Sequence, residues 1–157
     1  MKIKLLVIGK TDDKNLEQLI EKYQQRLNHY INFEIEIIPD IKNAKNLSQL
    51  QQKEKEGELI LSKLKNTDQL VLLDEKGKEF RSLDFANFLQ KKMNSGIKQL
   101  VLVVGGPYGF SESVYKKTVG KVSLSKMTFS HQMIRLFIVE QLYRGFTILK
   151  NEPYHHE

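Results

Sequence analysis

The sequence predicts an α/β domain built on an open, mostly parallel sheet with helices on both faces. Segments with strand and helix periodicity alternate along the whole chain, which is the pattern of such folds. Residues 69–73 and 99–104 are almost continuously apolar, as strands buried on both faces of a parallel sheet are. The 157 residues contain no internal repeat and no Pro- or Ser-rich linker. We therefore expect residues 1–157 to form a single domain.

Four elements are expected in the first half of the chain: a strand at 2–8, a helix at 15–31, a strand at 33–38 and a helix at 47–65. The first helix carries apolar side chains at helical spacing, and the second strand alternates apolar and acidic residues. The middle of the second helix, residues 51–58, is very polar and is predicted to be exposed.

In the second half, the strand at 69–73 is expected to end at a turn formed by Lys76 and Gly77. Ser82 and Ser130 are expected to cap the helices that follow them, because a serine hydroxyl accepts hydrogen bonds from the first helical amides. The remaining elements, in chain order, are a helix at 82–93, a strand at 99–104, a helix at 111–117, a strand at 122–124 and a long helix that ends near 149.

The long helix is apolar on more than one face over residues 133–143, so more than one neighbour should bury it. A central core helix would explain this pattern. A subunit interface explains it slightly better in a domain of this size.

The positive charge of the chain is unevenly distributed. The formal net charge is +6, yet residues 1–90 carry 15 basic and 15 acidic side chains, whereas residues 91–157 carry 10 and 4. A basic region of this kind suggests a polyanionic partner such as RNA. Charge alone fits a basic protein with a solvated lysine surface better, because a basic isoelectric point is a weak signal.

Several classes of protein are excluded by composition. The chain has no cysteine, which removes disulfides, thiolate metal sites and cysteine nucleophiles. No segment approaches the roughly 18 apolar residues of a membrane helix. The apolar run at 3–8 is too short for a signal peptide and is followed by charged residues, so we expect a cytoplasmic protein without a membrane segment.

Ligands of open α/β sheets bind beyond the carboxyl ends of the strands. Three such ends stand out: Leu73 with Asp74, the glycine-rich segment 105–109, and the segment 124–129. Gly105 and Gly106 would let the backbone approach a ligand closely, although an ordinary tight turn explains them as well. Neither a dinucleotide fingerprint nor a P-loop is present. The backbone amides and carbonyls of segment 124–129 could hydrogen-bond to the edge of an adenine ring. Alternatively, the segment could be a loop packed beneath the long helix.

An ordered set of motifs runs along the chain: Lys53-Glu-Lys-Glu-Gly57, Leu72-Leu-Asp74 with Gly77, Val104-Gly-Gly-Pro107 with Gly109, Leu124-Ser-Lys-Met-Thr-Phe129, His131-Gln132 with Arg135, Glu140-Gln-Leu-Tyr-Arg144 and Pro153-Tyr-His155. In this order they resemble the RlmH family of SPOUT-class RNA methyltransferases over essentially the full chain.

The resemblance implies a SPOUT α/β fold with a C-terminal trefoil knot, a homodimer, and S-adenosylmethionine as the methyl donor. It implies no metal. Its substrate would be a pseudouridine in large-subunit (23S) rRNA, methylated at ring nitrogen 3 in the assembled ribosome. The cofactor contacts carry over to Leu73, Gly105, Leu124, Ser125, Lys126, Met127, Thr128 and Phe129.

The imide nitrogen of such a substrate must lose its proton before it attacks the methyl group. His155 and Tyr154 in the tail are the candidate bases, with Arg144 and Arg135 as candidate anion stabilisers. A carbon-5 methyltransferase would ordinarily need a cysteine, so the absence of cysteine is consistent with direct attack by nitrogen.

Two positions depart from the family pattern. Tyr108 stands where the family often has Glu, and His156 replaces an arginine of the tail, which would weaken a phosphate contact. Two other functions stay open beside the methyltransferase. One is a non-catalytic RNA- or ribosome-binding protein with the same fold, and the other is a flavodoxin-like nucleotide-binding module.

Overall fold

One parallel sheet organises the molecule, which is described from a computed structural model. The structure describes residues 1–156, so Glu157, the last residue of the predicted domain and tail, lies outside the described residues. The strands are β1 (Lys2–Ile8), β2 (Phe33–Ile38), β3 (Asp68–Glu79), β4 (Gln99–Val104) and β5 (Gly120–Ser123). They are ordered β2-β1-β4-β3-β5, and every pairing is parallel, which confirms the predicted open parallel sheet.

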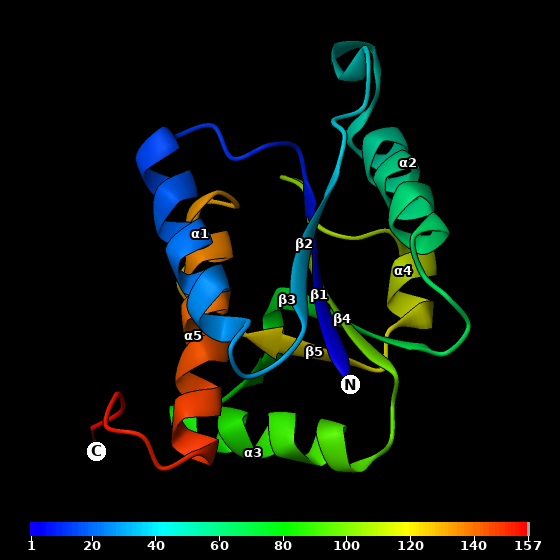
Figure 1. Ribbon diagram of the computed structural model, residues 1–157. Helices are drawn as coiled ribbons and strands as arrows, with labels where there is room; N and C mark the ends of the chain where they lie inside the picture. The colour runs from blue at the N-terminus through cyan, green and yellow to red at the C-terminus, as the bar shows by residue number, and fades with distance from the viewer. Residues whose placement is uncertain (157) are drawn as a thin grey trace.

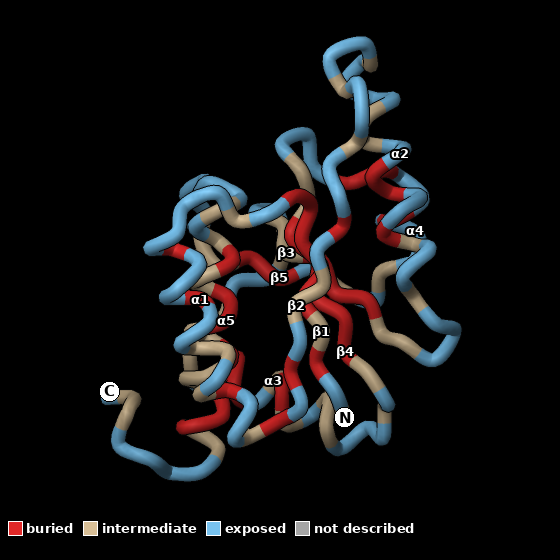
Figure 2. The backbone as a smooth tube through the Cα atoms, turned by 45° about the horizontal axis from the view of Figure 1, so that its top comes forward, coloured by how far each residue is buried: buried red, intermediate tan, exposed pale blue. Residues whose placement is uncertain are grey.

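Helices cover both faces of the sheet, as predicted (Figure 1). Helices α1 (Lys14–Leu27), α3 (Ser82–Asn94) and α5 (Met133–Leu149) pack on one face. Helices α2 (Gln49–Ser62) and α4 (Glu112–Lys117) pack on the other, and a 3-10 turn (Ala44–Asn46) precedes α2. The apolar strands β1 and β4 lie at the centre, and the buried parts of the chain line both sides of them (Figure 2).

The helix starts follow from local sequence. Asp13 caps α1 by accepting hydrogen bonds from the amides of Asn15 and Leu16. Ser48 and Gln51 form a reciprocal capping box at the start of α2. Ser82 is the first residue of α3 rather than its cap, so that prediction was wrong. Ser130 lies before the N-cap of α5, although its hydroxyl still accepts a hydrogen bond from the amide of Met133 at 3.1 Å.

Strand β3 is longer than expected, because it continues through the predicted turn to Glu79. Its second part pairs with β5, with Lys78 opposite Val122, after a register shift between Leu73 and Lys78. Gly77 allows this approach, since a Cβ there would lie 2.7 Å from the backbone of β5. Lys76 and Gly77 therefore do not form the predicted turn, because β3 continues through them and pairs with β5, a strand that is distant in sequence.

The middle of α2 is not fully exposed, which corrects a second prediction. Glu56 and Gly57 are both buried, Glu56 against Gly106 of the loop after β4 and Gly57 against Ser111 at the start of α4. A Cβ on Gly57 would lie 2.2 Å from the Ser111 hydroxyl oxygen, so the two helices meet where a side chain is missing.

Helix α5 is buried within a single chain by α1, α3 and the sheet. Ile138, Leu142 and Phe146 are part of this core, which confirms that the helix is a core element. Met133, at its start, is exposed. No helix among residues 1–156 is long and apolar enough to span a membrane.

Candidate functional site

A cavity of about 660 Å³ lies beyond the carboxyl ends of β4 and β5 and beside the middle of β3, where the register of its pairing shifts. Its walls are the segment after Leu73, the glycine loop at 105–109 and the segment at 123–131. Two of these segments follow the parallel strands β4 and β5, whose carboxyl ends lie at one edge of the sheet, and the third is the part of β3 where the register of its pairing shifts. The volume is in the range of pockets that take cofactor-sized ligands.

Two glycines shape the loop after β4 because no side chain fits there. A Cβ on Gly105 would lie 3.0 Å from the ring of Phe110, and one on Gly106 would lie 2.1 Å from Glu56 Oε2. Gly109 has a φ of +80° and donates a hydrogen bond to the carbonyl of Gly106 at 3.1 Å. The backbone of this loop therefore forms the cavity wall directly.

The segment after β5 is held by its own hydroxyls. Ser123 Oγ donates to the carbonyl of Ser125 at 2.9 Å, and Ser125 Oγ accepts from the amide of Met127 at 2.9 Å. Thr128 Oγ1 donates to Glu75 Oε2 at 3.2 Å, which ties the segment to the middle of β3. The Met127 side chain is 75% exposed, so the cavity mouth is partly apolar.

Asp74 and Tyr115 also line the cavity and form a hydrogen-bonded pair. Tyr115 of α4 donates a hydrogen bond to Asp74 Oδ2 at 2.6 Å. Burial, and after it the Asp74 carboxylate, raises the pKa of Tyr115 to about 12. The phenol therefore stays protonated at neutral pH and acts as a donor.

The structure brings together seven of the eight residues predicted to contact the cofactor. These cavity-lining residues are Leu73, Gly105, Leu124, Ser125, Met127, Thr128 and Phe129. Lys126 is exposed and does not line the cavity. Tyr108, the first departure from the family pattern, also lines it, beside Tyr115 and His131, which were not predicted to contact the cofactor.

Glu56 lies behind the glycine loop and was missed by the sequence reasoning. It is 3% exposed, Oε1 accepts a hydrogen bond from Gln52 at 3.0 Å, and Oε2 has no hydrogen-bond partner among residues 1–156. Burial raises the pKa of Glu56, the Gln52 hydrogen bond opposes this, and the nearby Asp40 and His131 contribute smaller effects. The sequence feature that indicates burial at this point is Gly57, because a glycine in the middle of a helix usually marks a close packing contact.

The three candidate catalytic residues form one cluster at the far end of α5. Arg144 Nη1 lies 3.3 Å from His155 Nδ1, and its guanidinium lies 4.7 Å from the ring centroid of Tyr154. None of the three lines the cavity. Arg144 follows the cavity residue Ile134 by ten positions, about 15 Å along a helix. Ile134 is in the first turn of α5, and Figure 1 shows the C-terminus beyond the last turn of that helix.

Arg135 has a structural role instead of facing this site. It is 2% exposed and donates hydrogen bonds to the carbonyls of Ile8, Gly9 and His131 and to the hydroxyl of Thr11. The burial lowers its pKa. Its guanidinium joins the end of β1 to the start of α5, so it is not placed to stabilise a substrate anion at the cavity or at the tail.

Comparisons with known proteins agree with this fold. The chain resembles a solved structure, "The structure of a probable methylase family protein from Haemophilus influenzae Rd KW20", with a TM-score of 0.51 over 99% of this chain and 70% of that one. The sequence identity is 10%, so this likeness concerns the fold alone.

Sequence relatives are much closer. "Ribosomal RNA large subunit methyltransferase H" of Flavobacterium psychrophilum is 73% identical over 157 residues, which is 100% of both chains. The proteins of the same name from Flavobacterium johnsoniae and Parabacteroides distasonis are 72% and 67% identical, again over 100% of both chains. A family model described as "Predicted SPOUT methyltransferase" matches residues 1–155. The chain therefore belongs to the SPOUT methyltransferases and, within them, to the ribosomal RNA large subunit methyltransferase H family.

Proposed function

We propose that this protein methylates ring nitrogen 3 of a pseudouridine in 23S rRNA of the assembled ribosome, with S-adenosylmethionine as the methyl donor. Relatives up to 73% identical over the full chain bear the name of a large-subunit rRNA methyltransferase. The observation that carries the proposal is the cavity at the carboxyl ends of β4 and β5 and the middle of β3, which is lined by seven of the predicted cofactor residues. Such an enzyme would act in the cytoplasm on complete ribosomes.

The residues of the cavity fit this methyl donor. S-adenosylmethionine, when bound, supplies a methyl group already activated on a sulfonium. The backbone of Gly105 and Gly106 offers amides and carbonyls without side chains in the way. Asp74 and Glu75 offer carboxylates that suit hydroxyl or ammonium groups. The apolar Leu73 and Leu124 suit the faces of a purine ring.

The active enzyme is proposed to be a homodimer in which the tail of one subunit completes the cavity of the other. The tail cluster is about 15 Å of helix away from the cavity of its own chain, so it cannot serve that cavity without a large movement. Met127, Phe129 and Met133 are exposed apolar residues around the cavity mouth and at the start of α5. Exposed apolar patches of this kind commonly mark interfaces. The C-terminal part is further proposed to form the trefoil knot of the family.

The contacts of Tyr154, His155 and Arg144 distinguish the proposed base from the proposed anion stabiliser. Burial, followed by hydrogen bonds with Tyr23 and Glu140, raises the pKa of Tyr154 well above its usual value, so this phenol remains a donor. His155 is then the better candidate for the base that takes the imide proton. Arg144, whose guanidinium is held beside Tyr154 and His155, is the proposed stabiliser of the resulting anion.

The first test is transfer of a labelled methyl group from S-adenosylmethionine to assembled ribosomes and to free rRNA, each with and without pseudouridine at the target. Transfer only to pseudouridine-containing ribosomes is expected. Cofactor binding without transfer to any of them would contradict the substrate, and absence of cofactor binding would favour the non-catalytic alternative.

A mixing experiment tests the shared site. One variant carries Leu124→Arg in the cavity, and the other lacks the residues after Glu152. Each homodimer is expected to be inactive, whereas co-expression should restore about a quarter of the activity, since half of randomly paired dimers contain one intact site of two. Absence of restoration, with mixed dimers verified by mass spectrometry, would contradict the shared site.

A further inference from the structure

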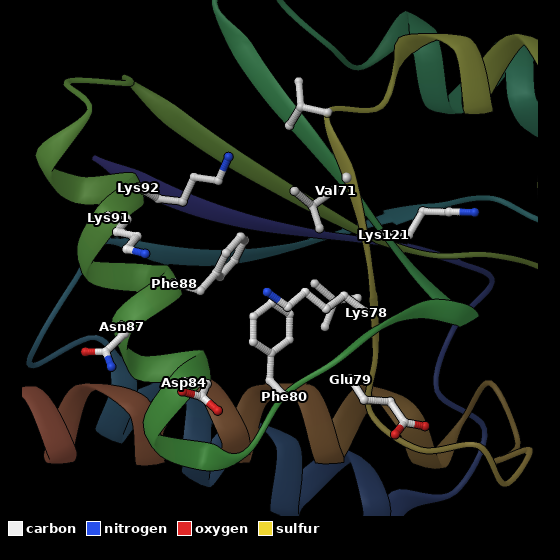
Figure 3. Close-up of a pocket in the computed structure, with 13 residues that line it drawn as sticks. Val71, Lys78, Glu79, Phe80, Asp84, Asn87, Phe88, Lys91, Lys92 and Lys121 are labelled. Carbon is white, nitrogen blue, oxygen red and sulfur yellow. The ribbon is translucent and has the colours of Figure 1, made fainter.

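A second cavity, of about 730 Å³, lies at the β5 edge of the sheet, between α3 and the end of β3 (Figure 3). Val122 is the only lining residue that it shares with the cavity described above, among the residues that the structure describes. No predicted site residue lines it. We refer to it as the lysine–phenylalanine cavity, after Lys78, Phe80, Phe88, Lys91 and Lys92.

The floor of this cavity is apolar and aromatic. Phe80, just after β3, and Phe88 of α3 have ring centroids 5.5 Å apart, and Val71 and Val122 of the sheet lie beneath them. Phe88 also stacks on the buried Phe85, with centroids 5.9 Å apart, which holds its ring in place. Figure 3 shows both rings of Phe80 and Phe88 facing the open space.

Ammonium groups from two separate elements surround this floor. Lys78 Nζ of β3 lies 4.9 Å from the ring centroid of Phe80, and Lys92 Nζ of α3 lies 5.5 Å from that of Phe88. Lys91 is exposed beside Lys92. Within residues 1–156, none of these three lysines has a carboxylate within 4.0 Å. Lys92 donates instead to Gln69 Oε1 at 2.7 Å.

The negative charges of the cavity are set apart from these lysines. The carboxylates of Glu79 and Asp84 lie on the far side of Phe80 from Lys92 in Figure 3. Lys121 points away from the cavity, with Nζ 5.5 Å from the ring centroid of Tyr115. The part of the cavity between Lys78 and Lys92 is therefore cationic over an aromatic floor.

We propose that the lysine–phenylalanine cavity binds one nucleotide of a single-stranded RNA segment, with its phosphate between Lys78, Lys91 and Lys92 and its base against Phe88. Charge complementarity selects a polyanion, and the half-buried aromatic rings of Phe80 and Phe88 select one that carries planar bases. The volume suits one nucleotide, since ligand pockets of about 300–1,000 Å³ take molecules of this size. The inference rests on the proposed function, because it assigns this surface to the same rRNA substrate.

The position of the cavity fits this role. Strand β3 contributes Leu73 to the 660 Å³ cavity, which we call the catalytic cavity after its proposed role, and Lys78 to the lysine–phenylalanine cavity. Five residues of strand span at most about 16 Å, which a few nucleotides of an extended strand can cover. An rRNA segment held at Lys78 would keep a neighbouring nucleotide near the catalytic cavity.

The experiment measures binding of the full-length protein to a fluorescein-labelled eight-nucleotide oligouridine across a series of salt concentrations. The variant Lys91→Gln/Lys92→Gln is expected to raise Kd about tenfold and to lower the slope of log Kd against log salt by about 1.4. Phe88→Leu, which keeps an apolar side chain in the core, should raise Kd about fivefold or more with an unchanged salt slope.

The matched control is Lys55→Gln/Lys117→Gln, which removes the same charge from exposed positions of α2 and α4 on the other face of the sheet. Kd should stay within about twofold of the wild-type value in this control. An equal loss in the control would overturn the proposal in favour of diffuse charge. Thermal melting of each variant verifies that the fold is retained.

Kinetics with ribosomes separate this proposal from the proposed function. Lys91→Gln/Lys92→Gln should raise KM for ribosomes while kcat and the Kd of S-adenosylmethionine stay unchanged. A raised KM with unchanged oligouridine binding would overturn the proposal in favour of a ribosomal protein as the partner. A change in sedimentation would overturn it in favour of a second copy of this chain. If the wild-type enzyme transfers no methyl group, the oligouridine series still tests the cavity.

Discussion

Tyr154 donates a hydrogen bond to Glu140 across 3.0 Å, which attaches the C-terminal tail to helix α5. The same oxygen, Glu140 Oε1, accepts hydrogen bonds from Arg144 Nε at 3.1 Å and from Nη2 at 2.8 Å. Tyr23 of α1 lies 3.3 Å from the Tyr154 hydroxyl and completes the network. One carboxylate therefore fixes both a proposed anion stabiliser and the tail that carries the proposed base.

Glu140→Gln should lower kcat for methyl transfer about tenfold or more, because the carboxylate charge that orients Arg144 and Tyr154 is replaced by a neutral amide with a single acceptor oxygen. The Kd of S-adenosylmethionine should not change, since Glu140 does not line the catalytic cavity. Single-turnover transfer and equilibrium dialysis measure the two effects. The control is Glu152→Gln, which alters a tail residue that hydrogen-bonds to Tyr30 instead. Unaltered kcat in Glu140→Gln would refute the positioning role.

Tyr154→Phe should leave the shape of the pH–rate profile unchanged between pH 7 and 10. The raised pKa of Tyr154 keeps the phenol protonated throughout this range. Removing the hydroxyl therefore does not change the number of groups that titrate in the profile. The rate itself should fall at every pH, because Glu140 loses a donor. An ascending limb that is present in the wild type and absent in Tyr154→Phe would identify Tyr154 as the base and contradict our assignment to His155.

The two arginines of α5 should respond differently to the same substitution. Arg135→Met leaves the buried carbonyls of Ile8 and Gly9 without donors and should lower the free energy of unfolding by about 3–5 kcal/mol. Arg144→Met, at a partly exposed ion pair with Glu140, should cost about 1 kcal/mol or less but should abolish methyl transfer. Urea unfolding and transfer assays on both variants test this division. Comparable stability losses would contradict it.

Glu56→Gln should stabilise the protein above neutral pH. The folded state raises the pKa of Glu56 above its ordinary value of 4.5, so the carboxyl contributes stability below that pH and loses it as pH rises through the folded-state pKa. At pH 8, the buried charge should make the wild type less stable than the variant by about 1 kcal/mol. The difference should shrink toward pH 5.

Denaturant melts of the wild type and Glu56→Gln at pH 5 and pH 8 measure this change. Glu54→Gln, at an exposed position of the same helix, is the control and should show no such pH dependence. A difference that grows toward low pH would contradict the sign of the argument.

The sequence was sufficient for the architecture and for most of the residues that line the 660 Å³ cavity, but not for contacts between distant segments. Apolar runs such as 99–104 identify buried parallel strands, and the glycine pair after β4 marks a cavity wall, because both signals are local. The extension of β3 past Gly77 depends on pairing with β5, more than 40 positions later in the chain. The burial of Glu56 depends on α4 and the glycine loop. Neither dependence is visible in a local pattern.

The strand order also decides when during its own synthesis this protein becomes functional. β1 is made first but lies between β2 and β4, so its second neighbour is available only after residue 104 has been made. The catalytic cavity further needs the segment at 123–131, and α5 covers the apolar face that includes Leu5, Val7 and Leu102. A chain interrupted before α5 would expose that apolar face and would be an aggregation-prone target for proteases. Translation must therefore be almost complete before a copy can fold and act, so premature termination yields no partly active product.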